Sequence, residues 1–325
     1  GKDARPNVMI FREKGKIRAI APLIRFKGVW KRFPFRILTL PLNYQSPRSG
    51  ILFTCEPDLL AQEMLGCLGR SKDWDVLLMD GIPVRSNFLP EFRRQATRMR
   101  LPTGEHYDPW FHSRLTMEGS WKEFLAGKSH KTRKNMGQAA RYLSELGTIT
   151  VQRHGTPEEI EEGVRAFLEI DSDSWKKDEG EIVVRDPILK NYYVDLTNTF
   201  SKSNRLEIWI LKIGGEPAAG YLCLKNQGTL YTLKTSYKSR YISARYSPGV
   251  VLLTDIMKNS WGTSLDAIDF CGWMPFVNRW SSEKQGYDHL VLYRKGPYPT
   301  AVHSMDFLKR MVRKRWSPSP VSLET

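Results

Sequence analysis

One loop of the chain could hold a phosphate group, because Ser247, Pro248 and Gly249 directly precede an apolar helix pattern. The start of a helix exposes backbone N–H groups and the positive end of the helix dipole, and both attract anions. We expect Ser247 to cap this helix, Pro248 to occupy the first turn, and Gly249 to let a ligand approach the backbone. The pattern predicts a phosphate site on the amides of Gly249, Val250 and Val251. An ordinary capped core helix would show the same pattern.

A net charge of +15, from 50 Lys and Arg against 35 Asp and Glu, predicts an anionic partner. Two clusters carry much of this charge. The central basic cluster comprises Lys128, Lys131, Arg133, Lys134 and Arg141. The C-terminal basic cluster comprises Lys309, Arg310, Arg313, Lys314 and Arg315. Either cluster could face a phosphate-bearing acceptor, an anionic membrane surface or, less readily, RNA, and either could be an ordinary solvated face.

The cysteines and histidines form neither a metal-binding nor a disulfide pattern. The four cysteines lie in apolar segments without a CxxC pair, and the six histidines show no metal-ligand spacing. No apolar run reaches the roughly 18 residues of a membrane span, and the start of the chain lacks the apolar core of a signal peptide. We expect no metal, and a cytoplasmic protein or one bound peripherally at the inner face of the membrane.

Two stretches about 200 residues apart predict the same order of elements, which is a hairpin, a strand, a Ser-Pro loop, a helix and a strand. In the first stretch these elements occupy residues 8–23, 37–42, 44–50, 57–68 and 74–80. In the second they occupy residues 206–224, 229–233, 246–250, 250–261 and 265–270. We interpret the repetition as a duplicated α/β unit with a mixed sheet. The earlier Ser-Pro loop is interpreted as a structural relic.

Two helices are expected between these stretches. A capping box at residues 120–123 predicts a helix that continues to Leu146, and Thr156 with the proline after it predicts the start of a second helix. Asp171 and Trp175 continue the apolar stripe of this second helix at helical spacing. A carboxylate therefore lies where an aliphatic side chain would be expected.

Three stretches in order resemble the GNAT superfamily of acyltransferases, in particular its Fem-related branch that includes cellulose-biosynthesis acetyltransferases. They are residues 120–135, 206–219 and 229–249, and the resemblance covers about residues 119–295. It implies tandem GNAT-like domains of the α/β class with mixed sheets. Residues 1–118 would form a first domain that is incomplete at its N-terminus, as in a trimmed chain. Residues 119–300 would form the acyltransferase domain, and residues 301–325 a basic helix and tail.

The resemblance implies acetyl-CoA or another acyl-CoA as the donor, with its pyrophosphate on the Ser247 loop. The thioester would lie against the strand that carries Lys234 and Thr235. GNAT enzymes usually have a loop richer in glycine at this position. The sequence contains no Ser-His-Asp or Cys-His arrangement, so we expect direct attack within a ternary complex.

Such a transfer needs a group that removes the proton of the nucleophile and a donor for the leaving thiolate. Tyr237 could protonate the thiolate, and Asp171 or Asp269 could act as the base if burial raises its pKa. Each of the three could instead be a structural residue.

Relatives carry a Tyr-Lys-x-Arg-Trp-like run after the last core strand, where this chain has Val277 at the lysine position. A role of that lysine cannot be transferred. Arg279 could still hold a phosphate or carboxylate, and we expect Trp175 and Arg279 to contact the acceptor.

The leading hypothesis is an acyl-CoA-dependent N- or O-acyltransferase that modifies a sugar or glycan precursor in envelope or exopolysaccharide synthesis. One alternative is a Fem-type transferase that uses aminoacyl-tRNA, although no long coiled-coil heptad pattern is visible. Another is a non-catalytic GNAT-like module that binds RNA or a membrane.

Overall fold

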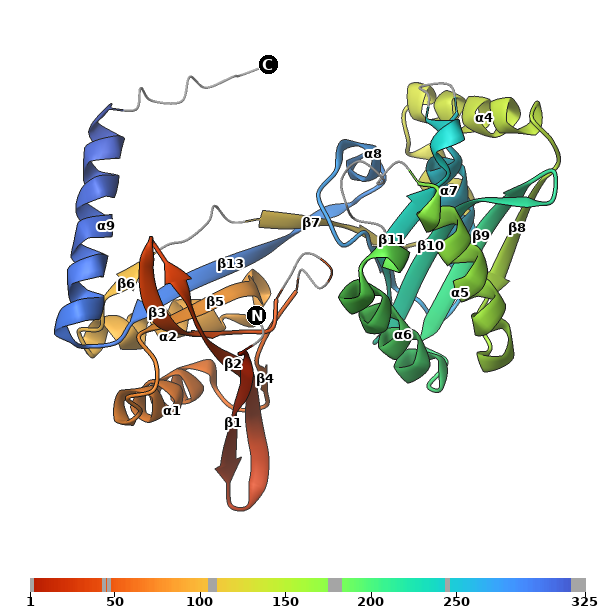
Figure 1. Ribbon diagram of the computed structural model, residues 1–325. Coiled ribbons are helices and arrows are strands. Elements are labelled where there is room, and N and C mark those ends of the chain that lie inside the picture. Colours follow the sequence, from red (N-terminus) through yellow and green to blue (C-terminus); the bar gives the residue numbers. More distant parts are fainter. Residues whose placement is uncertain are drawn as a thin grey trace. The chain divides into compact units, whose positions relative to one another are not determined.

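The computed structural model of the protein describes residues 3–42, 45, 48–104, 110–174, 183–242 and 246–316 (Figure 1). The chain forms two compact units, the first made of Gly1–Phe111 with Gln285–Thr325 and the second of His112–Lys284. These limits differ from the predicted boundaries at residues 118 and 300. The difference arises from strand pairing, because β13 (Glu283–Tyr293) follows the second unit in sequence but pairs with β5 (Val76–Pro83) of the first.

The first unit is built on a sheet with the strand order β1-β2-β3-β5-β13. Strands β1, β2 and β3 span Arg5–Glu13, Lys16–Trp30 and Phe33–Thr39, while the short β4 (Leu52–Phe53) pairs with β2 and β6 (Thr103–Gly104) pairs with β13. The helices are α1 (Pro57–Arg70), α2 (Phe88–Arg98) and α9 (Pro297–Trp316). Lys14 and Gly15 both have positive φ, as a tight hairpin turn requires. The predicted hairpin is therefore confirmed.

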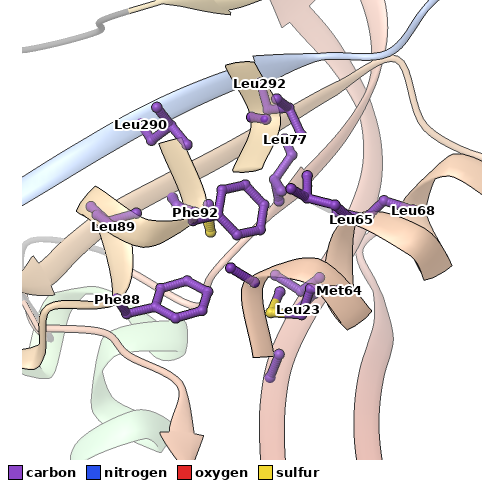
Figure 2. Close-up of a cluster of buried hydrophobic side chains, with 14 of the residues drawn as sticks. Leu23, Met64, Leu65, Leu68, Leu77, Phe88, Leu89, Phe92, Leu290 and Leu292 are labelled. Atoms are coloured by element: carbon purple, nitrogen blue, oxygen red, sulfur yellow. The ribbon is translucent and has the colours of Figure 1, made fainter. Parts of the chain in front are cut away.

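Helices α1 and α2 bury an apolar face against this sheet (Figure 2). In α1 the buried residues Met64, Leu65 and Leu68 follow helical spacing. They belong to one cluster with side chains from α2 and from four strands, among them Phe88, Phe92, Leu23, Leu77 and Leu290. Full burial of each such side chain stabilises the fold by about 1.5–3 kcal/mol. The first unit therefore has a hydrophobic core of its own.

The second unit has the strand order β7-β12-β11-β10-β9-β8. Its strands are β7 (Trp110–Thr116), β8 (Ile149–His154), β9 (Leu206–Ile213), β10 (Glu216–Asn226), β11 (Thr229–Tyr237) and β12 (Ala267–Asp269). Its helices are α3 (Trp121–Ala126), α4 (His130–Ser144), α5 (Pro157–Ser172), α6 (Pro187–Ser201), α7 (Pro248–Ser260) and α8 (Pro275–Asn278). Helices α5 and α6 cover one face of the sheet and α4 and α7 the other (Figure 1).

The two units repeat one connection. In the first unit, β2 and β3 are antiparallel and the chain then passes through α1 to β5, which is parallel to β3. In the second unit, β10 and β11 are antiparallel and the chain passes through α7 to β12, which is parallel to β11. The prediction of a duplicated α/β unit with mixed sheets is confirmed.

The helix predicted from residue 120 to Leu146 is in fact two helices. The capping box is present, with the amide of Glu123 donating to Ser120 Oγ and the amide of Ser120 donating to Glu123 Oε2. Helix α3 ends at Ala126, and Ser129 caps a new helix by accepting a hydrogen bond from the amide of Thr132 at 3.1 Å. The prediction of one continuous helix was wrong because a second cap follows within ten residues. Among the described residues, no helix is long and apolar enough to cross a membrane.

Candidate functional site

The strands β11 and β12 diverge in the middle of the second unit. They pair in parallel over three residue pairs, from Thr229 opposite Ala267 to Tyr231 opposite Asp269. Strand β12 ends there, whereas β11 continues for six more residues to Tyr237, a length of about 20 Å. Within the part of the chain that the structure describes, this stretch of β11 pairs only with β10. The two strands therefore separate after Tyr231 and Asp269.

A bulge in β11 decides which side chains point to which face. The register with β10 shifts between Leu222 and Cys223, so Lys234 lies opposite Leu222 and Ser236 opposite Gly220. A Cβ atom at Gly220 would lie 2.8 Å from the ring of Phe167 in α5. Directly paired residues share a face, so Lys234 and Ser236 point toward α5 and α6. Thr235 and Tyr237 point to the α7 face by alternation.

The start of α7 differs in detail from the predicted phosphate site. The hydroxyl of Ser247 makes no capping hydrogen bond, which corrects the expectation that it caps the helix. The amides of Val250 and Val251 both donate to the carbonyl of Ser247 at 3.0 Å. These two amides close the first turn, which leaves Gly249 and the dipole of a 13-residue helix as the features that could attract an anion.

Tyr237 lies beside this helix start. A Cβ atom at Gly249 would lie 3.7 Å from Cδ1 of the Tyr237 ring. Burial raises the pKa of the Tyr237 hydroxyl, so the group is protonated at neutral pH and can donate a proton or a hydrogen bond. The structure thus brings together Tyr237 and Gly249, which were predicted to act together at the donor.

Thr235, predicted to lie against the donor, is half-buried on the same face as Tyr237. Its Oγ1 donates to the carbonyl of Gly220 at 3.4 Å. Lys234 was predicted to contact the donor as well, but its ammonium lies over the ring of Tyr193 in α6, on the opposite face of the sheet from α7. The side chain of Lys234 therefore faces the side of the sheet on which Asp171 lies.

Asp171 is fully buried at the C-terminal end of α5. Its Oδ2 accepts a hydrogen bond of 2.8 Å from the amide of Val183. Three residues later, Ser174 bridges to Lys238, the residue that follows Tyr237. Asp171 therefore lies near the carboxyl end of β11, on the α5 face, while Tyr237 lies on the α7 face. The two residues therefore lie near the same end of β11 but on opposite faces of the sheet.

Asp269 lies far from Tyr237 along β11. It is fully buried opposite Tyr231, about six residues of β11 before Tyr237, and so about 20 Å from it along the strand. Its Oδ1 accepts a 2.8 Å hydrogen bond from the amide of Cys271 and lies 3.7 Å from Nδ1 of His112. The structure does not bring Asp269 together with Tyr237, contrary to the expectation that both could serve one reaction centre.

Of the residues predicted to contact the acceptor, Trp175 lies outside the described residues. Arg279 is exposed at the C-terminal end of α8, and its carbonyl accepts a 3.3 Å hydrogen bond from Lys128 Nζ. Val277, at the position where relatives carry lysine, is buried in the core.

Part of the central basic cluster makes hydrogen bonds within the fold. Lys128 donates to the carbonyls of Arg279 and Trp280 at 3.3 Å. Arg133 donates to carbonyls at the end of α3, including that of Ala126 at 3.0 Å. Two of the five cations therefore tie helices together instead of facing a partner. Of the C-terminal cluster, only the side chain of Lys309 lies within the described residues, and it is exposed.

Sequence reasoning missed Ser236, whose side chain is fully buried on the same face as Lys234. The signal was weak, because a single serine in a strand is common, and the bulge that sets its direction has no clear sequence mark. No group of three His, Cys, Asp or Glu side chains that could hold a metal occurs among residues 3–42, 45, 48–104, 110–174, 183–242 and 246–316.

Comparison with known proteins identifies the fold. Residues 130–281 match the model of the acetyltransferase (GNAT) domain. The crystal structure of FemX is similar over 93% of this chain and 91% of that chain, with a TM-score of 0.61 and 10% identity. A C-terminal DUF2156 domain from Agrobacterium fabrum is similar over 94% and 88%, with a TM-score of 0.53 and 11% identity. A conserved protein of unknown function from Bacteroides thetaiotaomicron is similar over 90% and 86%, with a TM-score of 0.53 and 12% identity.

No curated protein matches the sequence. The two units share a mixed α/β fold, and residues 130–281 of the chain are similar to the acetyltransferase (GNAT) domain.

Proposed function

We propose that the protein transfers an acyl group from an acyl-CoA thioester directly to an amine or hydroxyl group of a sugar or glycan-precursor acceptor. The observation that carries this proposal is that β12 ends opposite Tyr231 while β11 continues to Tyr237, which lies beside the start of α7. A linear amide-containing donor could lie along β11 where β12 has ended, as an extra strand does.

The residues at the start of α7 fit the phosphate end of such a donor in part. Gly249 has no side chain to block approach, and the helix dipole attracts the negative charge. The amides of Val250 and Val251 already donate to the carbonyl of Ser247. We therefore expect the helix start to bind phosphate more weakly than it would with three amides that lack an intrahelical partner. When bound, acyl-CoA supplies the activated thioester carbonyl.

The two faces of the sheet then have different roles. The acceptor approaches from the α5 face, and Asp171 takes the proton of its amine or hydroxyl as the new bond to the carbonyl carbon forms. The carbon–sulfur bond breaks, and Tyr237 on the α7 face donates its proton to the thiolate. The raised pKa of Tyr237 keeps this proton in place before the reaction. Tyr237 then regains a proton from solvent and Asp171 releases its proton to solvent, which restores both residues.

The acceptor class rests on the resemblance to cellulose-biosynthesis acetyltransferases. A Fem-type reaction with aminoacyl-tRNA is the second candidate, because FemX shares the fold over almost the whole chain. Lys128 and Arg133 of the central basic cluster donate hydrogen bonds to backbone carbonyls of the protein. Fewer cations are therefore left to bind the phosphates of an RNA, which argues against a large RNA-binding surface there. We therefore rank acyl-CoA first. The remaining cations of that cluster could face a phosphate-bearing acceptor or an anionic membrane surface.

Titration calorimetry with acetyl-CoA tests the proposal. We expect binding by the wild-type protein at millimolar or lower concentration of the ligand, and release of free thiol that depends on an added amino sugar. Absence of binding together with steeply salt-dependent binding of aminoacyl-tRNA would replace this proposal with the Fem-type reaction. Absence of both would leave a binding module.

A further inference from the structure

We propose that Lys234 and Ser236 form a binding site for a carboxylate group of the acyl acceptor, on the face of β11 that α5 and α6 cover. The inference rests on the proposed function, because it specifies the class of acceptor that the transfer site takes. It starts from two buried polar groups for which the described part of the chain supplies no ion pair or side-chain hydrogen bond.

Lys234 is a buried lysine that has no counter-ion among the described residues. The residue is only 6% exposed, and its Nζ lies 5.4 Å from the centre of the Tyr193 ring. Among the described residues, no carboxylate forms an ion pair with this Nζ. Lysine is rarely buried unless it is paired, because removal of the ammonium from water is costly. The ring of Tyr193 offsets part of this cost through a cation–π interaction.

Ser236 is a buried hydroxyl with unused hydrogen-bonding capacity. The residue is fully buried, and Oγ has no hydrogen-bond partner within the described part of the chain. Lys234 and Ser236 lie two residues apart beyond the bulge, so both side chains point to the same face at a spacing of about 7 Å along the strand. The flexible lysine side chain can bring its ammonium close to the Ser236 hydroxyl around one small group.

Other buried charged side chains of this sheet differ from Lys234 because they form ion pairs within the protein. Lys238 Nζ lies 2.6 Å from Glu169 Oε1. On the same sheet the buried Glu207 contacts both Arg153, at 2.6 Å, and Lys225, at 2.9 Å. The fold thus compensates these buried charges internally. We infer that the charge of Lys234 is compensated by a ligand.

The donor set matches a carboxylate. One ammonium and one hydroxyl offer a single positive charge and hydrogen bonds to two oxygens, which suits a monoanion. A phosphate dianion would keep an uncompensated negative charge in the same buried place. Because Asp171 lies on this face near the end of β11, an acceptor held by its carboxylate could present its amine or hydroxyl to that base.

The test uses binding without an acyl donor. Muramic acid and D-glucosamine are the probes, since they share the amino sugar and differ by a group that carries a carboxylate. In calorimetry with the full chain we expect muramic acid to bind at least about tenfold more tightly than glucosamine. Lys234→Met should bring the two probes within about threefold of each other, and Ser236→Ala should reduce the preference in part.

Three outcomes would overturn the proposal. The first is a wild-type protein with no preference for muramic acid, and the second is a Lys234→Met variant that keeps the preference. The third is tighter binding of D-glucosamine 6-phosphate than of muramic acid, which would show that the site takes phosphate. These results do not depend on acetyl-CoA, whose binding is measured separately. Failure of acetyl-CoA to bind would contradict the proposed function and not the carboxylate site.

Thermal unfolding separates a ligand site from a structural role. Lys234→Met removes a buried charge that no described carboxylate pairs with, so we expect the ligand-free variant to melt about 2 °C or more above the wild type. Lys225→Met is the matched control, because it removes a paired lysine on the same sheet; it should lower the Tm and keep the preference for muramic acid. A lower Tm for Lys234→Met would show that the fold needs this lysine and would overturn the inference.

Discussion

Gly249 lies against the ring of Tyr237, so close that a Cβ atom at position 249 would be 3.7 Å from Cδ1 of that ring. The contact joins the last residue of β11 to the first turn of α7. A group bound at the helix start therefore has a protonated phenol beside it, because burial raises the pKa of Tyr237. In the proposed reaction, this arrangement would link binding of the donor to protonation of the leaving group.

Substitution of Gly249 tests the donor site. The residue does not have a positive φ, so a side chain is tolerated by the backbone, and a Cβ atom would make an ordinary contact with Tyr237. We expect Gly249→Ala to change the KM for acetyl-CoA by less than about threefold. Gly249→Leu should fill the approach to the helix start and raise this KM about tenfold or more with little change in Tm. Equal KM values for the two variants would place the donor elsewhere.

Tyr237→Phe tests the proposed acid. It removes the hydroxyl but keeps the ring against Gly249, so we expect kcat to fall about 100-fold while the KM for acetyl-CoA stays within a few fold. Steady-state assays of thiol release measure both constants. Tyr231→Phe, on the same strand but opposite Asp269, is the control and should change kcat by less than about threefold. Similar losses in the two variants would show that the effect comes from packing of the strand.

Much of the fold could be predicted from local signals. The hairpin at Lys14 and Gly15 and the capping box at Ser120 depend on residues close together in sequence, and the structure confirms both. The exchange of β13 into the first unit could not be predicted, because pairing between β13 and β5 joins segments about 200 residues apart. Sequence patterns do not specify which of several apolar strands will be neighbours.

The candidate site was predictable only in part. Tyr237 and Gly249 were identified from the strand and helix patterns, and the structure brings them together. The separation of Asp269 from Tyr237 could not be predicted, because it depends on where β12 stops pairing with β11. The directions of Lys234 and Ser236 depend on a one-residue bulge, and such a shift reverses every later side chain in a strand.

Asp269 is expected to be a structural residue. Its carboxylate accepts a hydrogen bond from the amide of Cys271, which has a positive φ that a non-glycine residue adopts only with support. We expect Asp269→Ala to lower the free energy of unfolding by about 1–3 kcal/mol, because the Cys271 amide loses its partner. Urea denaturation measures this loss. The kcat of the folded variant should stay well above that of Tyr237→Phe, and a larger loss of kcat at full stability would make Asp269 a catalytic group instead.

The ion pair between Asp75 and Arg36 predicts a pH-dependent stability of the first unit. The Nε and Nη2 atoms of Arg36 donate to the Asp75 carboxylate at 2.8 and 2.6 Å, and its amide donates at 3.0 Å. Hydrogen bonds from Arg36 lower the pKa of Asp75 from 3.8 to about 2. Because the folded pKa lies below the unfolded one, this contribution is complete above pH 4 and is lost as the pH falls toward 2. At pH 7 it amounts to about 2 kcal/mol.

Asp75→Asn should therefore lower the free energy of unfolding by about 2 kcal/mol at pH 7, and the difference from the wild type should shrink between pH 4 and pH 2. Urea denaturation followed by tryptophan fluorescence measures it, since Trp74 precedes Asp75 and is buried in the same unit. Asp73→Asn is the matched control. Its carboxylate pairs with Arg25 but is mostly exposed, so its loss should cost less than about 1 kcal/mol. A difference between Asp75→Asn and the wild type that stays constant down to pH 2 would show that the asparagine acts through packing and not through the lost charge.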